Sequence, residues 1–242
     1  MKTEPDERYL EYGSRRIPYL LRISDRKKLR ITVRPDLSVS VDAPTGYSAG
    51  EIEDAVRAKG RWLAKQLDEI AAFHPLPKPY RFVSGETLVY LGRQYRLRVS
   101  KGEPGPAKLR GRYLEVSVRD KKEVGAVKYA VGVWYRTRAE DRFAQCFERC
   151  LEIAMRHGAE RPTLVIRKMR TRWGSCTAEG RMTLNLYLVQ APIHCIDYVV
   201  MHELCHTVEH NHSEAFYRLL TRCMPDWAKR KAVLNGVTVR EV

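Results

Sequence analysis

The stretch Met201-His202-Glu203-Leu204-Cys205-His206 decides how the rest of this 242-residue chain is interpreted. Positions four apart lie on the same face of a helix, one turn above each other. His202 and His206 can therefore direct two imidazoles at one metal ion, with Zn–N distances of about 2.0–2.1 Å. Glu203 can reach a water on that metal without being a ligand, which is the arrangement of a general base. The alternative is that both histidines are polar residues of a partly exposed helix.

A catalytic zinc site needs a third protein ligand, which leaves the fourth position for water. The residues after the motif that can supply it are Glu209, His210, His212 and Glu214. In an unbroken helix His210 would lie about 12 Å along the axis from His202, at 1.5 Å per residue. Two ligands of one ion cannot be that far apart, so His210 is excluded unless the helix bends.

His212 can reach the metal only if the helix ends near Glu209 and the chain folds back. Asn211 tolerates the left-handed conformation that ends helices, and Ser213 is a good N-cap for a following helix. We therefore predict His212 as the third ligand. His210 then becomes either a solvent-facing residue, which we favour, or a donor to the transition state.

The spacing from His206 to His212 equals that of the metzincin pattern His-Glu-x-x-His-x-x-Gly-x-x-His. Glu209 stands at the glycine position of that pattern, which argues against a metzincin assignment. The class of enzyme therefore rests on other motifs.

The first 120 residues are expected to be β-rich with one helix. Apolar and polar residues alternate, as in strands, over 17–23, 29–34, 37–41, 87–90, 95–99, 108–110 and 113–118. Ser48, with Glu51 three residues later, predicts an N-cap and capping box for a helix that runs to about Phe73. The proline-rich run 74–79 indicates a stiff, extended connector, and 91–94 a hairpin turn.

Beyond residue 120 the pattern changes to helices with a few strands. One or two helices are expected over 123–157, strands over 163–169 and 182–189, a helix from Ile193 and another from Ser213. We therefore expect an α+β chain, with a β-rich N-terminal region over 1–120 and a catalytic domain over 121–242. The N-terminal region is a candidate for binding substrate or nucleic acid.

The net charge of +15 favours polyanionic partners, nucleic acid first and an acidic membrane surface second. Residues 1–121 hold twenty-five basic and sixteen acidic side chains, and the remainder nineteen and thirteen, so the excess is spread along the chain. The alternative is a solvated surface that happens to be basic.

A cytoplasmic protein with free thiols is expected. The first residues lack the apolar core of a signal peptide, and no later stretch approaches the length of a membrane span, so a membrane partner is not expected. The six cysteines contain no Cys-x-x-Cys spacing, and Cys195 and Cys205 stand in apolar sequence as small core residues.

Several separate motifs, in order, resemble those of the YgjP-like metallopeptidase family, which is related to the SprT-like and WLM zinc peptidases. They are Arg172-Trp173-Gly174-Ser175-Cys176, Leu184-Asn185-Leu186, the motif at 202–206 and Asn211-His212-Ser213, within a matching segment of roughly 163–227. The resemblance implies a minimal zincin core of the gluzincin-like type, with a support helix, a short sheet and a metal helix. It also implies one Zn²⁺ ion held by His202, His206 and His212, with Glu203 as catalytic base.

The function expected from these motifs is a zinc-dependent metallopeptidase that hydrolyses peptide bonds of a protein or peptide substrate, with Glu203 activating a zinc-bound water. SprT-like relatives act on proteins bound to DNA, and some carry a zinc ribbon, but no Cys-x-x-Cys pair follows the metal helix here. One alternative is a basic DNA-binding protein with a structural or vestigial zinc site. Another is an adaptor without metal.

Substrate contacts are expected around the motif, each with a plainer alternative. Residues 183–187, including Asn185, are either an edge strand that holds the substrate backbone or an ordinary buried strand. Trp173 and Ser175 either line the cleft or pack in a turn. Arg172 either stabilises an oxyanion or belongs to a basic cluster that contacts phosphates or solvent. That cluster comprises Arg161, Arg167, Lys168, Arg170, Arg172 and Arg181.

Overall fold

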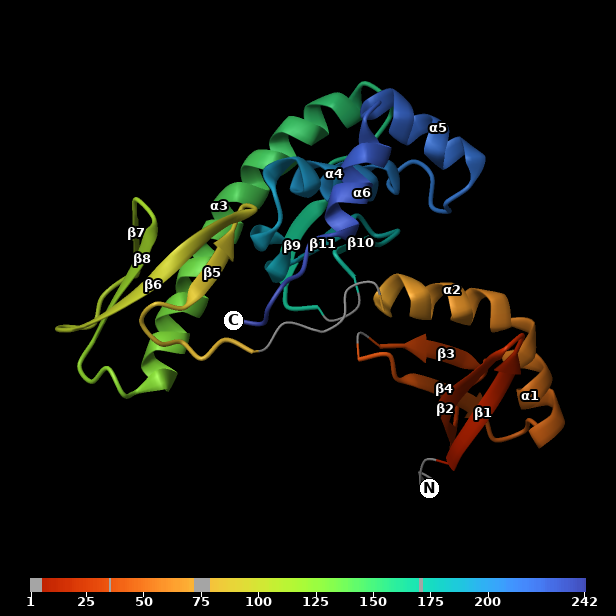
Figure 1. The fold of residues 1–242 in the computed structure, drawn as a ribbon. Coiled ribbons are helices and arrows are strands. Elements are labelled where there is room, and N and C mark those ends of the chain that lie inside the picture. The colour runs from red at the N-terminus through yellow and green to blue at the C-terminus, as the bar shows by residue number, and fades with distance from the viewer. Residues whose placement is uncertain (1–5, 35, 72–78, 170–171) are drawn as a thin grey trace. The chain divides into compact units, whose positions relative to one another are not determined.

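Figure 1 shows the computed structural model, which describes residues 6–34, 36–71, 79–169 and 172–242. The chain forms two compact units, Met1–Pro77 and Lys78–Val242, called unit 1 and unit 2 below. Each unit has a separate buried apolar core. The architecture is mixed α+β, with a β-rich N-terminal sheet followed by helices, as the sequence predicted. The connector expected over residues 74–79 falls almost entirely outside the described residues.

Unit 1 is a four-stranded sheet with two helices. The strands are β1 (Asp6–Tyr12), β2 (Arg15–Ser24), β3 (Arg30–Val33) and β4 (Val39–Pro44), in the order β1-β2-β4-β3. β2 and β4 are parallel, and the two outer pairs are antiparallel. The sequence pattern predicted β2, β3 and β4 but missed β1. The reason is that Leu10 is the only fully buried residue of β1, so the strand has almost no hydrophobic alternation.

The helices of unit 1 are α1 (Ala49–Ala58) and α2 (Gly60–Ala71). The predicted capping box is confirmed, because Ser48 and Glu51 each bond the other's backbone N–H through their side chains. The single helix expected here is interrupted at Lys59, the C-cap of α1. Gly60 follows, and the ring of Tyr12 lies where a Cβ of residue 60 would stand, so only glycine fits.

Unit 2 begins with a second four-stranded sheet. Its strands are β5 (Thr87–Tyr90), β6 (Arg93–Lys101), β7 (Lys108–Arg110) and β8 (Tyr113–Val118), in the order β5-β6-β8-β7, close to the predicted ranges. The helix α3 (Val124–Met155) is continuous and covers one face of this sheet (Figure 1). Tyr135, on α3, is fully buried and donates a hydrogen bond from its hydroxyl to the Val89 carbonyl at 2.6 Å.

The remaining elements of unit 2 follow α3 in the sequence. They are β9 (Thr163–Arg167), β10 (Gly174–Cys176), β11 (Arg181–Asn185), the 3-10 helix η1 (Leu186–Gln190), α4 (Ile193–Cys205), α5 (Glu214–Cys223) and α6 (Trp227–Asn235). Of these, α4, η1 and β9 pack against α3. The strand expected over 182–189 was wrong in its second half. Asn185 caps η1 by accepting a hydrogen bond from the Tyr187 N–H at 3.1 Å, which turns the chain out of the strand.

The division of the chain expected after residue 120 falls inside unit 2. The helix α3 packs against β8, which precedes residue 120 in the sequence, and also against β9, which follows it. Leu88 and Leu97 of the first sheet therefore belong to the same cluster of buried residues as Leu184 of the second. The units divide instead at Pro77, in the proline-rich run.

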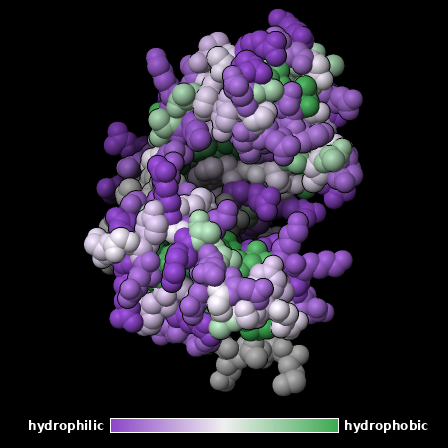
Figure 2. Space-filling view, turned by 90° about the vertical axis from the view of Figure 1, so that its right-hand side faces the viewer, coloured by the Kyte–Doolittle hydropathy of each residue, from purple (hydrophilic) through white to green (hydrophobic). Residues whose placement is uncertain are grey.

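All six cysteines are free thiols, as predicted, and Cys195 and Cys205 are buried core residues. Hydrophilic side chains cover most of the face shown in Figure 2, with scattered apolar residues between them. Among the described residues, no helix is both long enough and apolar enough to cross a membrane.

The core of unit 1 can be tested on α2, where Leu63 is 0% exposed and its neighbour Trp62 is 43% exposed. We expect Leu63→Ala to lower the free energy of unfolding of unit 1 by about 2–5 kcal/mol, because it removes a fully buried side chain. Trp62→Ala is the matched control, with an expected change below about 1 kcal/mol. Hydrogen exchange of peptides from unit 1 measures both, and equal losses of protection would contradict this packing.

Candidate metal centre

The helix α4 is buried along most of its surface. Ile196, Val200 and Leu204, at helical spacing, are completely buried, and α4 packs against α3. His202 and His206 are only partly buried and lie on the remaining side of the helix. The apolar positions therefore set the rotation of α4, and that rotation directs the two histidines away from α3.

The chain leaves α4 at Cys205, earlier than the end expected near Glu209. The hydroxyl of Thr207 donates to the Leu204 carbonyl at 2.8 Å, and the Glu209 N–H donates to the Cys205 carbonyl at 2.9 Å. These bonds satisfy the last carbonyls of the helix. Asn211 does not adopt the left-handed conformation that we expected, and the helix ends through these bonds instead.

His212 stands in the turn between α4 and α5, next to the predicted N-cap. The Ser213 hydroxyl accepts a hydrogen bond from the Phe216 N–H at 3.3 Å, which confirms the cap. The chain thereby folds back, so that one nitrogen from each of His202, His206 and His212 lies within 4.8 Å of the others. The Nε2 atoms of His202 and His212 are 2.9 Å apart.

Phe216, a completely buried residue of α5, packs against all three imidazoles. Its ring centroid lies 4.5 Å from that of His206 in a stacked arrangement, and 4.9 Å from those of His202 and His212. One aromatic side chain therefore limits the rotation of three histidines that come from two elements.

The electrostatics of His202 and His206 suit metal binding. Burial, with His206 and His212 nearby, lowers the pKa of His202 to about 3. Burial also lowers the pKa of His206, whose Nδ1 lies 3.0 Å from the Glu209 carbonyl, which leaves Nε2 for a ligand. Nδ1 of His202 is buried without a hydrogen-bond partner in the described part of the chain. Neutral imidazoles whose nitrogens converge in this way fit a divalent ion such as zinc.

Glu203 is not one of the three converging groups; it directly follows His202 in α4 and is 6% exposed. Its burial raises the pKa of the carboxyl to about 7, against the lowering effects of Arg172 and the Cys176 backbone. Gly174 passes so close that a Cβ at this position would lie 2.7 Å from Oε1 of Glu203. The strand β10 therefore forms a wall behind the carboxylate, with no room for a side chain at residue 174.

The family model of the YgjP-like metallopeptidase domain matches residues 27–236 of the chain. The chain belongs to the YgjP-like metallopeptidase family. Among solved structures, the metallopeptidase zymogen of Pyrococcus abyssi abylysin is 19% identical, over 41% of this chain and 99% of that one, with a TM-score of 0.35. No curated protein matches this chain significantly. The family confirms the resemblance described above, supports a peptidase acting on proteins or peptides, and implies a bound metal ion.

In this YgjP-like chain β11, the strand that precedes α4 in the sequence, is not the edge strand that we expected. The order β10-β11-β9 places β11 in the centre of its sheet, because it pairs with both neighbours. The edge strands are β10 and β9, and β10 is the one that passes close to Glu203. Asn185 is buried, and its amide donates to the carbonyls of Met169 and Arg172 at 2.9 and 3.0 Å. Its side chain thus holds the loop before β10.

The other residues expected to contact substrate are only partly brought together. Trp173 borders a hollow beside Glu203, whereas Ser175 does not line that hollow and pairs with Thr183 in the sheet. Arg172 is exposed and influences Glu203 electrostatically. His210 is exposed, and its Nδ1 lies 3.0 Å from the His206 carbonyl, which agrees with the solvent-facing interpretation.

The basic cluster over 161–181 is partly engaged in structural bonds. Arg161 forms two bonds of 2.8 and 2.7 Å with the Glu148 carboxylate. Lys168 donates to the Val242 carbonyl at 2.6 Å. Arg170 lies outside the described residues.

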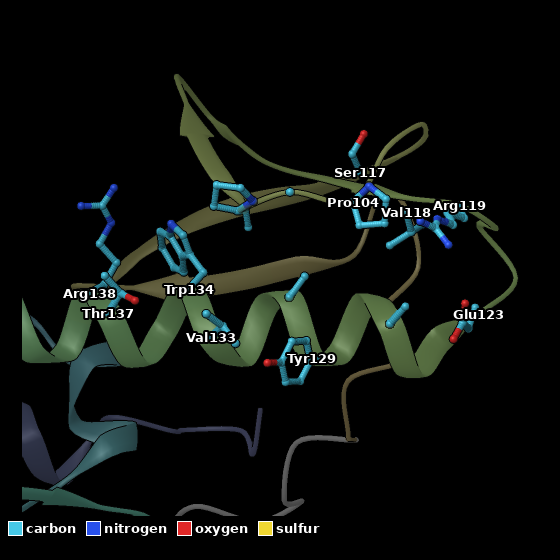
Figure 3. Close-up of a pocket in the computed structure, with 15 residues that line it drawn as sticks. Pro104, Ser117, Val118, Arg119, Glu123, Tyr129, Val133, Trp134, Thr137 and Arg138 are labelled. Carbon is cyan, nitrogen blue, oxygen red and sulfur yellow. The ribbon is translucent and has the colours of Figure 1, made fainter.

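A larger hollow, of about 770 Å³, lies away from the histidines, between α3 and the loop that contains Pro104 and Pro106 (Figure 3). Val133 and Trp134 of α3 contribute apolar walls. Neither Glu203 nor any of the three histidines borders it, so it is separate from the candidate metal centre.

Sequence reasoning missed the roles of Phe216 and Gly174. Phe216 is the third residue of the helix that Ser213 caps, and its N–H bonds to that cap, so its closeness to His212 could have been inferred from the predicted cap. Gly174 offered no such signal, because its closeness to Glu203 arises only when β10 packs beside α4.

Metal content tests the histidine cluster. We expect His202→Ala, His206→Ala and His212→Ala each to weaken zinc binding by more than the roughly 10–100-fold caused by losing a group that only orients a ligand. His210→Ala is the control and should keep its zinc, because its ring is exposed and outside the cluster. Mass spectrometry of dialysed protein measures the metal. Loss of zinc in His210→Ala, with retention in His212→Ala, would contradict the assignment.

Proposed function

We propose that this YgjP-like chain is a zinc-dependent peptidase that hydrolyses peptide bonds of protein substrates, with Glu203 as the general base. The observation that carries the proposal is a buried carboxylate that directly follows the first of three converging histidines and lines the same hollow as that histidine. His202, His206 and His212 would hold the ion through their free ring nitrogens. A bound zinc ion would polarise a water molecule and the carbonyl of the scissile bond.

Glu203 would move the proton of the reaction. It accepts a proton from the attacking water and delivers it to the leaving nitrogen as the C–N bond breaks. The wall formed by Gly174 keeps the carboxylate in place. The edge position of β10 supports binding of the substrate backbone by strand addition, and Arg172, which influences Glu203 electrostatically, would stabilise developing negative charge.

Glu203→Gln tests the mechanism, because it keeps the shape of the side chain and removes its basicity. We expect peptidase activity to fall by about 10²–10⁴-fold, with unchanged zinc content and thermal unfolding. Glu214→Gln, at an exposed carboxylate that begins α5, is the matched control and should keep its activity. A zinc-loaded Glu203→Gln protein with the activity of the unmodified chain would rule out this role.

A second candidate function is nucleic-acid binding through unit 2. The two halves of the sequence both carry an excess of positive charge, but the two compact units do not share that excess evenly. Unit 1 holds fourteen basic and twelve acidic residues, and unit 2 holds thirty and seventeen. The electrostatic attraction for a polyanion is therefore concentrated in unit 2.

The outer face of the sheet β5–β8 is the specific observation behind this candidate. Leu97 and Val99 of β6 point into the core, so Arg96 and Arg98 alternate to the opposite face, away from α3. The guanidinium of Arg98 lies 3.9 Å from the ring centroid of Tyr113 on β8. Exposed arginines beside an aromatic ring suit contacts with phosphates and bases.

Salt dependence tests this surface. We expect the double variant Arg96→Gln/Arg98→Gln to bind DNA more weakly at low salt and to reduce the slope of log K against log[salt] by about two. The control Arg156→Gln/Arg218→Gln removes the same charge from exposed positions on α3 and α5. Identical slopes for both double variants would show that the sheet face is not the binding surface.

A further inference from the structure

A hollow of about 200 Å³ opens beside Glu203 and His202, between α4, β10 and α6. It has apolar walls and a polar mouth. The wall residues are Trp173, Tyr198, Val199 and Leu234, and the mouth residues are Lys231 and Asn235. The space suits one side chain of the size of leucine or phenylalanine.

The walls are rigid parts of the core. Val199 and Leu234 are 4% and 3% exposed, and the little surface that they retain faces this hollow. Tyr198 packs against the first histidine of the motif, with ring centroids 5.9 Å apart. An apolar side chain placed here would therefore lie directly beside the proposed reaction centre, and would replace water against preformed apolar walls.

The helix α6 sets the position of the mouth. Arg230 bonds to Asp226 at 2.8 Å and to the His194 carbonyl at 3.4 Å, which ties α6 to the start of α4. Lys231, Leu234 and Asn235 are three and four residues apart and so share one face of α6. This face is the one that closes the hollow.

Lys231 brings a positive charge to the mouth of this hollow, whose lining also includes His202 and Glu203. It is exposed, and in the described parts of the chain it has no ion-pair partner. It lines the same hollow as His202 and Glu203, so it lies near the candidate metal centre. A free cation at this place lacks an anionic partner that a substrate can provide.

We propose that this hollow is a specificity subsite for a substrate residue with an apolar side chain next to the scissile bond, and that Lys231 binds a substrate carboxylate close to that residue. The carboxylate comes from one of two sources, the free C-terminus of the apolar residue itself or an acidic side chain that follows it. The inference rests on the proposed peptidase function, and it assigns Lys231 and the walls as specificity-determining residues.

Three matched peptides test the carboxylate: acetyl-Ala-Ala-Leu with a free C-terminus, the same peptide as its amide, and acetyl-Ala-Ala-Leu-Glu amide. Calorimetric binding to zinc-loaded Glu203→Gln protein avoids any dependence on cleavage. We expect at least one carboxylate peptide to bind about tenfold more tightly than the Leu amide, the effect of a modest charge-assisted hydrogen bond. The peptide that gains identifies the source of the carboxylate. Equal binding of all three would overturn the proposal.

Lys231→Met, made in the same protein, should remove the difference between the carboxylate and amide peptides. Lys229→Met, on the same helix but outside the hollow, is the matched control and should keep it. Replacing the peptide's Leu by Ala should lower cleavage, measured as kcat/KM of the unmodified enzyme, by roughly tenfold or more. Retention of the preference in Lys231→Met would overturn the role of this lysine.

The outcomes separate the two proposals. Selective binding without cleavage by the unmodified enzyme would support the subsite and overturn the peptidase function. Cleavage without any preference for the carboxylate or for leucine would support the peptidase function and overturn the subsite.

Discussion

Burial of α4 against α3 is the constraint on which the rest of the site depends. A helix that hides Ile196, Val200 and Leu204 completely has one orientation left for its polar side chains. That orientation places Glu203 where water is largely excluded, and burial raises the pKa of its carboxyl while it lowers that of His202. The same packing that stabilises unit 2 therefore shifts the pKa values of the groups that we propose for metal binding and base catalysis.

Two small residues, Ser213 and Gly174, complete this arrangement in different ways. The Ser213 hydroxyl starts α5 and so brings Phe216 under the three imidazoles. On the opposite side, Gly174 lets β10 approach the Glu203 carboxylate more closely than any other residue would allow. The Ser213 cap thus positions the ring that packs on the three histidines, and the absence of a Cβ at Gly174 allows β10 to pack against Glu203. Neither group needs to touch the metal or the substrate to matter.

Most of the candidate functional features lie in unit 2. Unit 2 contains the histidine cluster, the hollow beside Glu203, most of the excess positive charge and the exposed arginine face of its first sheet. Its N-terminal sheet shares one core with the helices that follow, through α3. If both proposals hold, a peptidase site and a polyanion-binding face would lie on one compact unit, and nucleic acid would hold the enzyme near its protein substrates.

The sequence by itself determined the features that depend on local geometry. The spacing of His202 and His206, the Ser213 cap after His212, the Ser48 capping box and the strands of the two four-stranded sheets other than β1 follow from short-range periods and caps. Only the tertiary structure decided that β10 is an edge strand close to Glu203, that the units divide at Pro77, and that Lys231 of α6 lines the hollow beside Glu203. The physical reason is that strand order and close approach depend on which distant segments pack together, and no local pattern of residues records that choice.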